Sequence, residues 1–190
     1  MTGGRPRDRR IDDAVMQAVR ELLAEGDYAS LTVTAVAARA GTSTNAIYRR
    51  WPSKILLVHE AIYVDTPANP IEDSGDLRTD LRRLVDAVVV TFSDPTIRAA
   101  LPGLLMEIMG DPGLHDVLLA RFRGPVWEGL GKRLDAAVAA GQTRAGVDPN
   151  LVFEALTGTV FFSYVLRMEP VVDDDWADRC VDLLMRGIAP

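Results

Sequence analysis

The stretch that decides the fold of this chain is TVTAVAARAGTSTNAIYRRWPSK, residues 32–54. It predicts two short helices joined by a tight turn, which is a helix-turn-helix. Such a unit needs a small residue on the first helix, a turn residue that tolerates a positive φ, and an apolar residue that locks the second helix in place. Ala37, Gly41 and Ile47 fill these three positions.

Both helices have a start signal and a buried face. Thr32 is placed to cap a helix over residues 33–40, and Ser43 is placed to cap one over residues 44–50. Apolar residues recur at intervals of three and four along both segments, as in a helix that buries one side. The residues left facing outward are Thr44, Asn45, Tyr48 and Arg49.

The outward set has the chemistry of a base-reading surface. An asparagine amide can pair with adenine and an arginine guanidinium with guanine in the major groove, while hydroxyls reach phosphates. The ordinary alternative is a solvated helix face. Because the two capping residues and the Ala-Gly-Ile spacing occur together, the segment favours DNA recognition over that alternative.

The same segment resembles a known family. LTVTAVAARAG at 31–41, TSTNAIYRRW at 42–51 and the following Ser53-Lys54 pair are similar to the TetR family of bacterial transcriptional regulators. The resemblance covers about a quarter of the chain. It implies an all-α protein, in which an N-terminal three-helix DNA-binding domain precedes a C-terminal helical domain for ligand binding and dimerisation.

The resemblance also implies roles for individual residues. Thr32 and Tyr48 resemble phosphate-contacting positions, and Lys54 resembles a phosphate contact at the start of the next helix. Thr44, Asn45 and Arg49 resemble positions on the recognition helix. The whole predicted DNA-contacting set is Arg5, Arg7, Thr32, Thr42, Ser43, Thr44, Asn45, Ala46, Tyr48, Arg49, Arg50 and Lys54.

Charge is divided unevenly along the chain. The 190 residues carry a net charge of −6, yet residues 1–60 hold nine Lys and Arg against seven Asp and Glu. The cationic end should face DNA phosphates, which would repel the acidic remainder. The basic run at residues 5–10 is either an arm for the minor groove or a tail without a role, and the sequence leaves both open.

Composition predicts a soluble cytoplasmic protein. The hydrophobic content of 48% allows a sizeable core, and a single cysteine, Cys180, excludes an internal disulfide. No uninterrupted apolar run of about 18 residues occurs, and the basic N-terminus leads into no signal-type apolar segment. We therefore expect no membrane association.

Helical periodicity continues beyond the helix-turn-helix. Helices are expected at 11–25 and 53–63, and the Pro- and Asp-rich stretch at 65–74 predicts a loop. We place the domain boundary there, with a DNA-binding domain at 1–64, its helix-turn-helix at about 33–51, and a C-terminal domain at 65–190. Further helices are expected at 76–92, 96–109 and 112–140, with kinks at Pro102 and Pro125.

The last two predicted helices indicate a dimer. Residues 148–168 are apolar around most of the helix, and residues 173–188 form an apolar stripe, so another subunit is the simplest cover. The alternative is a core within one chain. The family resemblance implies a four-helix bundle between subunits, and the predicted interface is Val152, Leu156, Thr159, Val160, Ser163, Trp176, Cys180, Leu183 and Leu184.

Aromatic and methionine residues in the C-terminal part suggest a ligand pocket. Such side chains line adaptable apolar pockets, although they also fill ordinary cores, and the family resemblance favours the pocket. The predicted ligand-binding residues are Phe92, Leu105, Met106, Met109, Phe122, Trp127 and Phe161.

No enzymatic signature is present. The two histidines stand alone, no nucleophile elbow or phosphate loop occurs, and no metal or cofactor is expected. The predicted function is a homodimeric repressor that a small apolar effector releases from a palindromic, double-stranded operator. A helical adaptor that binds a protein partner through its acidic body, and an unrecognised helical enzyme, are the alternatives.

Overall fold

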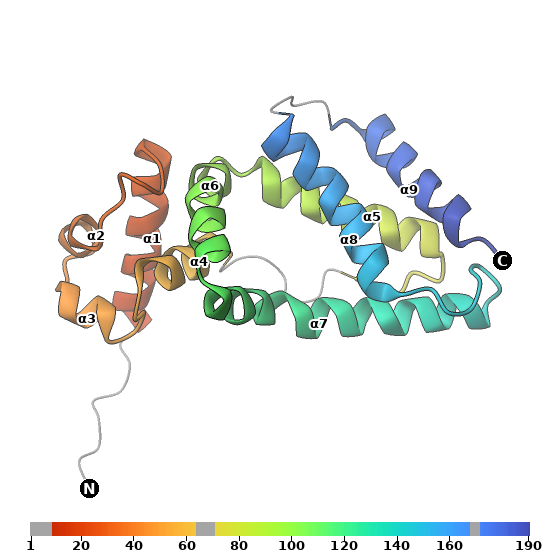
Figure 1. Ribbon diagram of the computed structural model, residues 1–190, viewed down its shortest axis with the longest axis horizontal. Coiled ribbons are helices and arrows are strands. Elements are labelled where there is room, and N and C mark those ends of the chain that lie inside the picture. Colours follow the sequence, from red (N-terminus) through yellow and green to blue (C-terminus); the bar gives the residue numbers. More distant parts are fainter. Residues whose placement is uncertain (1–8, 64–70, 168–171) are drawn as a thin grey trace, which may run out of the picture. The chain divides into compact units, whose positions relative to one another are not determined.

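The computed structural model describes residues 9–63, 71–167 and 172–190, and all regular structure in these ranges is helical, as predicted (Figure 1). The side chains of residues 112, 115 and 119–127 lie outside this description. The chain forms two compact units. Unit 1 comprises Met1–Asp65 and Pro95–His115, and unit 2 comprises Thr66–Asp94 and Asp116–Pro190.

The helices of unit 1 begin within two residues of the predicted starts. They are α1 (Arg9–Glu25), α2 (Val33–Arg39), α3 (Thr44–Tyr48), α4 (Lys54–Tyr63) and α6 (Pro95–Gly110). The hydroxyl of Thr32 accepts the Ala35 amide at 3.1 Å, and that of Ser43 accepts the Ala46 amide at 3.2 Å, which confirms both predicted caps.

The recognition helix α3 is shorter than predicted. It ends at Tyr48 rather than at Arg50, because the Arg50 amide donates to the carbonyl of Ile47, only three residues back, at 2.8 Å. Pro52 follows and has no amide hydrogen to continue a helix. A tight turn therefore separates α3 from α4.

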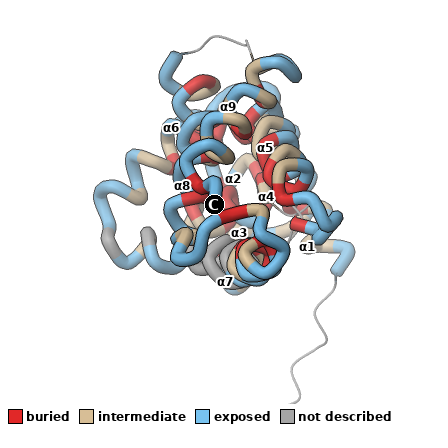
Figure 2. Tube along the Cα trace, turned by 90° about the vertical axis from the view of Figure 1, so that its right-hand side faces the viewer, coloured by how far each residue is buried: buried red, intermediate tan, exposed pale blue. Residues whose placement is uncertain are grey.

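The core of unit 1 forms where α1 packs against α2, α4 and α6, and where α4 packs against α6. Buried and exposed positions alternate along these helices (Figure 2), as expected for amphipathic segments. Val15 and Val19 of α1 and Leu57 of α4 have no exposed surface. Arg20 of α1 donates to the Ala61 carbonyl at 2.7 Å, so a polar contact adds to the apolar ones.

Helix α6 packs with the N-terminal helices, whereas the sequence prediction assigned its residues to the C-terminal domain. It runs through Pro102 as one helix and contacts the loop after α1, where the Tyr28 amide donates to the Ala99 carbonyl at 3.3 Å. A Cβ added at Gly103 would come within 2.7 Å of the Tyr28 Cβ and closer still to its ring. Glycine is therefore required at this crossing.

Unit 2 contains α5 (Leu77–Ser93), most of α7 (Pro112–Ala139), α8 (Pro149–Phe161) with a π-helical continuation η1 (Phe162–Leu166), and α9 (Asp174–Ile188). Helix α5 packs on both α8 and α9. The buried carboxylate of Asp80 pairs with the buried Arg133 of α7, which also donates to Gln142 at 3.2 Å. Each of the two buried charges therefore has the opposite charge beside it within unit 2, which offsets the cost of removing a charge from water.

The packing of α8 corrects part of the predicted dimer interface. Val152, Leu156 and Val160 are at most 3% exposed, and α8 packs on α5 and α9. Ser163 is also buried, at 7% exposure. The three aliphatic side chains fill the core of their own chain and are not available to a partner, whereas Ser163 lines a surface groove between α8, η1 and α9. Of the remaining predicted interface residues, Thr159 and Leu183 are exposed, and Trp176, Cys180 and Leu184 are partly exposed.

Substituting Gly103 tests the crossing between α6 and the loop that holds Tyr28. Alanine is the better helix former by about 1 kcal/mol, but its Cβ would strike the Tyr28 ring. We expect Gly103→Ala to lower the free energy of unfolding by about 1–3 kcal/mol in urea titrations. Gly110→Ala, in the same helix and with open space around the added Cβ, is the control. Equal stability of the two variants would contradict the close approach.

Candidate nucleic-acid interface

The packing of α2 against α3 fixes which residues of α3 face outward. Val36, Ala37 and Ile47 are 0%, 5% and 1% exposed, and they form the contact between the two helices. Gly41 adopts a φ of +64° in the turn, which is the positive value that the sequence pattern requires. With Ile47 buried, the opposite side of α3 is free to meet a ligand.

The outward side of α3 carries the predicted contacts. Asn45, Tyr48 and Arg49 are exposed, and Thr44 is partly exposed. Arg49 forms no ion pair with any residue that the structure describes. An amide, a phenol, a hydroxyl and a free guanidinium are thus presented together, and this is the donor and acceptor set that can meet base edges and phosphates.

The two capping residues remain able to contact phosphate. Thr32 and Ser43 are exposed, and each side-chain oxygen already accepts a backbone amide. A hydroxyl in this role still has its own hydrogen to donate. Thr42 and Ala46, also in the predicted set, are partly exposed, and Ala46 offers only a methyl group. Arg5 and Arg7 lie outside the described residues.

Arg50 does not face outward. Its side chain is 12% exposed, forms an ion pair with Asp12 of α1, and donates to the Ala46 carbonyl at 3.2 Å. This position corrects the predicted role of Arg50 as a DNA contact, because the guanidinium ties the end of α3 to α1. The sequence alone did not indicate this pair, since the two residues are 38 positions apart and neither lies in a recognisable motif.

Lys54, at the first position of α4, is held by Tyr28. Its ammonium donates to the Tyr28 carbonyl at 2.5 Å and lies 4.1 Å from the centre of the Tyr28 ring. Burial lowers the pKa of Lys54, and the nearby Glu107 and Asp27 carboxylates oppose that effect. An ammonium has three donors, so two remain available for a phosphate.

The Tyr28 phenol is buried and joins a second element. Tyr28 is 5% exposed, and its hydroxyl donates to the Glu107 carboxylate of α6 at 2.7 Å. Burial raises the pKa of Tyr28, and the Glu107 carboxylate raises it further, so the phenol stays protonated as a donor. Sequence reasoning missed both residues. The only available signal was an aromatic residue shortly after Gly26, which ends α1.

The predicted ligand residues are divided between the two units. Phe92 and Phe161 meet in unit 2, edge to face, with ring centres 5.7 Å apart. Leu105, Met106 and Met109 lie on α6 in unit 1, where the two methionines are 73% and 82% exposed and therefore line no enclosed cavity of that unit. The side chains of Phe122 and Trp127 lie outside the described residues.

Comparison with known proteins agrees with this geometry. Residues 15–61 match the protein family described as bacterial regulatory proteins, tetR family. Residues 71–184 match the family described as the tetracyclin repressor-like C-terminal domain. An uncharacterized HTH-type transcriptional regulator of Mycobacterium tuberculosis is 34% identical over 160 residues, covering 80% of this chain and 75% of that protein. The chain belongs to the TetR family.

Further relatives of this TetR family member cover nearly its whole length. The DNA-binding transcriptional repressor TetR of Mycobacteroides abscessus is 28% identical over 89% of this chain and 88% of its own length. A TetR family transcription regulator of known crystal structure superimposes with a TM-score of 0.65 at 28% identity, over 95% of this chain and 99% of that one. The chain is thus a DNA-binding transcriptional regulator and not an enzyme.

The two adjacent arginines should respond differently to substitution. Arg49→Gln should reduce the slope of log affinity against log salt by up to about 1, because one cation is lost from the surface that faces DNA. Arg50→Gln should leave that slope unchanged and lower the unfolding temperature, because Asp12 loses its partner. Fluorescence anisotropy with an operator duplex over a KCl series, and thermal unfolding, measure the two effects. An equal loss of slope in both variants would place Arg50 on the DNA.

Proposed function

We propose that this regulator is a homodimeric repressor that occupies a palindromic operator in the cytoplasm and is released by a small apolar ligand. The observation that carries the proposal is the exposed polar side of α3, whose Asn45 and Arg49 can read bases while Ile47 anchors the helix. Thr32, Ser43, Tyr48 and Lys54 would contact phosphates around it. Arg5 and Arg7 would extend the contact as an N-terminal arm.

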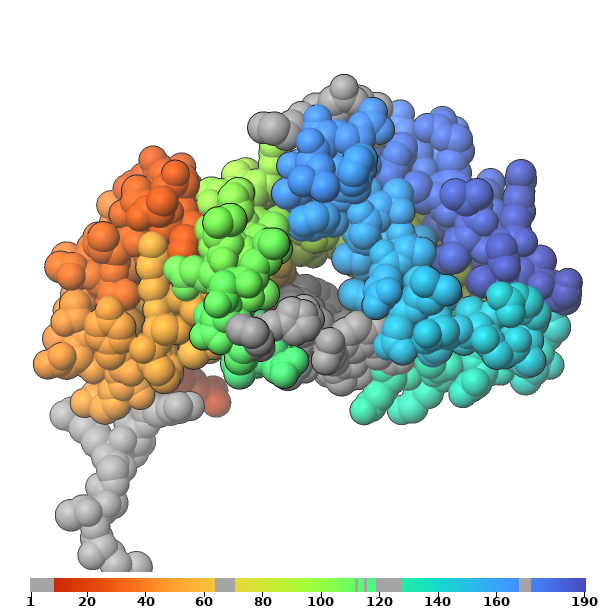
Figure 3. Space-filling model, viewed as in Figure 1, coloured from red at the N-terminus to blue at the C-terminus, as the bar shows by residue number. Residues whose placement is uncertain are grey.

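An uncovered apolar face on α8 and η1 supports the dimer. Leu151, Phe162 and Leu166 are 64%, 53% and 61% exposed, and Leu183 of α9 is 76% exposed. Helix α8 lies at the surface of unit 2 in the space-filling view (Figure 3). Such a patch on a soluble domain is typical of an interaction site, and a second copy of the chain can cover it.

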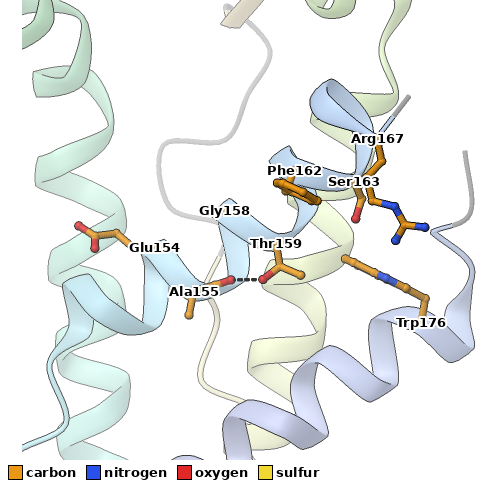
Figure 4. Close-up of a pocket in the computed structure, with 8 residues that line it drawn as sticks. All are labelled: Glu154, Ala155, Gly158, Thr159, Phe162, Ser163, Arg167 and Trp176. Carbon is orange, nitrogen blue, oxygen red and sulfur yellow. Dashed lines mark hydrogen bonds between the residues drawn. The ribbon is translucent and has the colours of Figure 1, made fainter. Parts of the chain in front are cut away.

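A shallow groove marks the same face. It lies between α8, η1 and α9, and Gly158, Phe162 and Trp176 are among its lining residues (Figure 4). Thr159 donates its hydroxyl to the Ala155 carbonyl at 2.5 Å, so this polar group needs no partner from another molecule. Gly158 leaves room for the close approach of a second helix.

A lipid bilayer is a less suitable cover for this face. Residues Pro149–Leu166 are long and apolar enough to cross a membrane by length and composition, and 22% of them are buried. However, α8 packs on α5 and α9, and these two helices are joined by ion pairs from Arg78 and Arg82 to Asp178. Inserting α8 into lipid would either separate it from α5 and α9 or carry the charged side chains of these two helices into hydrocarbon.

Release by a ligand follows from the dimer. Two recognition helices must enter successive major grooves about 34–36 Å apart, so an effector that favours another spacing lowers operator affinity. A difference of about 1.4 kcal/mol between the two arrangements changes affinity about tenfold. The Phe92–Phe161 contact in unit 2 belongs to the apolar set that we assign to the effector.

Footprinting the purified protein on its own upstream DNA tests this function. We expect protection of a two-fold symmetric site, which shrinks or disappears when the matching apolar compound is added from a panel. Protection of a single half-site by monomeric protein would contradict the dimeric mechanism. Symmetric protection that no compound in a broad panel relieves would contradict release by an apolar effector.

Charge placed on the apolar face should separate the subunits. Leu183→Glu should convert the dimer to monomers in analytical ultracentrifugation and weaken operator binding at least about tenfold, because a monomer presents one recognition helix. Val90→Glu, at a similarly exposed apolar position on α5 with 71% exposure, is the matched control and should stay dimeric. Monomers in both variants, or in neither, would contradict the proposed interface.

A further inference from the structure

Tyr28, which follows α1, connects α4 and α6 at one point. Its backbone amide binds Ala99 and its hydroxyl binds Glu107, both on α6, at 3.3 and 2.7 Å. Its carbonyl accepts the Lys54 ammonium of α4 at 2.5 Å, and its ring lies under the same ammonium. We call this connected group, Lys54–Tyr28–Glu107, the Tyr28 strut.

The strut is rigid for physical reasons. The Tyr28 ring is buried, and Gly103 of α6 approaches it so closely that no Cβ fits. The ring therefore cannot move toward α6, and the Glu107 hydrogen bond, which involves a charged acceptor, restrains it from moving away. A displacement of α6 would shift the Tyr28 carbonyl and ring, and with them the ammonium of Lys54.

The helix that carries Glu107 is joined to unit 2 at both of its ends. Both ends of the 95–115 segment continue directly into unit 2, at Asp94 and at Asp116, so a movement of unit 2 can be transmitted to α6 through the backbone. Lys54 is the first residue of α4, immediately after the recognition helix and its turn. The Tyr28 strut is therefore a direct polar connection between α6, which continues into unit 2, and the Lys54 ammonium, which is proposed to contact phosphate.

We propose that Tyr28 and Glu107 are positioning residues for DNA binding, which hold the Lys54 ammonium and the start of α4 where the operator phosphate is bound. This inference rests on the proposed DNA-contacting role of Lys54. Neither Tyr28 nor Glu107 touches DNA in this arrangement. Loosening the strut reduces operator affinity without removing a phosphate contact.

The test uses full-length protein and the duplex recovered by in vitro selection with that protein. Tyr28→Phe removes only the phenolic oxygen and should weaken binding about fivefold, while the slope of log affinity against log salt stays unchanged. Glu107→Gln keeps a neutral acceptor and should weaken binding less. The double variant should bind no more weakly than Tyr28→Phe, because both changes act on the same contact.

Two controls separate positioning from stability. Tyr164→Phe removes another hydrogen-bonded phenol, whose oxygen accepts the Ser93 hydroxyl at 2.9 Å in unit 2, and it should leave operator affinity unchanged. Lys54→Met should reduce the salt slope by about 1, because it removes the phosphate contact itself. All affinities are measured well below the lowest unfolding temperature of the set. Glu107 is exposed, so its variant remains folded even where Tyr28→Phe does not.

Several outcomes would overturn the inference. A Tyr28→Phe variant that binds within about twofold of the wild type, or additive effects in the double variant, would show that the strut does not position Lys54. A Lys54→Met variant with an unchanged salt slope would remove the phosphate contact on which the inference rests. Wild-type protein that selects no duplex would overturn the DNA-binding function together with the strut.

Discussion

The burial of Ile47 against α2 is the contact on which the DNA-binding surface depends. Helix α3 has five residues, and an isolated helix of that length is unstable in water. It keeps its shape because Ser43 caps its start, Ile47 anchors its middle and the buried Trp51 follows its end. Since one side of α3 is fully occupied in this way, the opposite side must carry Asn45 and Arg49 toward solvent.

The charge distribution of unit 1 favours sequence-specific over non-specific binding of DNA. Most described cations of this unit are already engaged: Arg39 pairs with Glu25, Arg50 with Asp12, and Lys54 with the Tyr28 carbonyl. Arg49 is left with no such partner among the described residues, surrounded by hydroxyl and amide groups. Specificity then depends on directed hydrogen bonds, which suits a chain whose net charge of −6 opposes non-specific binding.

Local patterns in the sequence predicted what local forces determine. Helix starts, the turn at Gly41 and the anchoring role of Ile47 follow from caps, backbone conformation and periodicity, and all three are present in the structure. Contacts between distant residues could not be found in this way. The Asp12–Arg50 and Tyr28–Glu107 contacts join residues that share no motif. Which of these side chains lie close enough to bond depends on how the helices pack, and only the fold shows that.

Helix α8 illustrates the limit of periodicity most clearly. Its apolar residues surround the helix, which predicts cover on every side without saying which neighbour covers which residue. In the fold, Val152 and Val160 face the chain's own core, whereas Leu151 and Leu166 remain uncovered. The uncovered half costs a lone subunit free energy in water, and the proposed two-fold partner would remove that cost while supplying the second recognition helix. In the proposed dimer, the same apolar residues would therefore serve both the association of the subunits and the binding of a palindromic site.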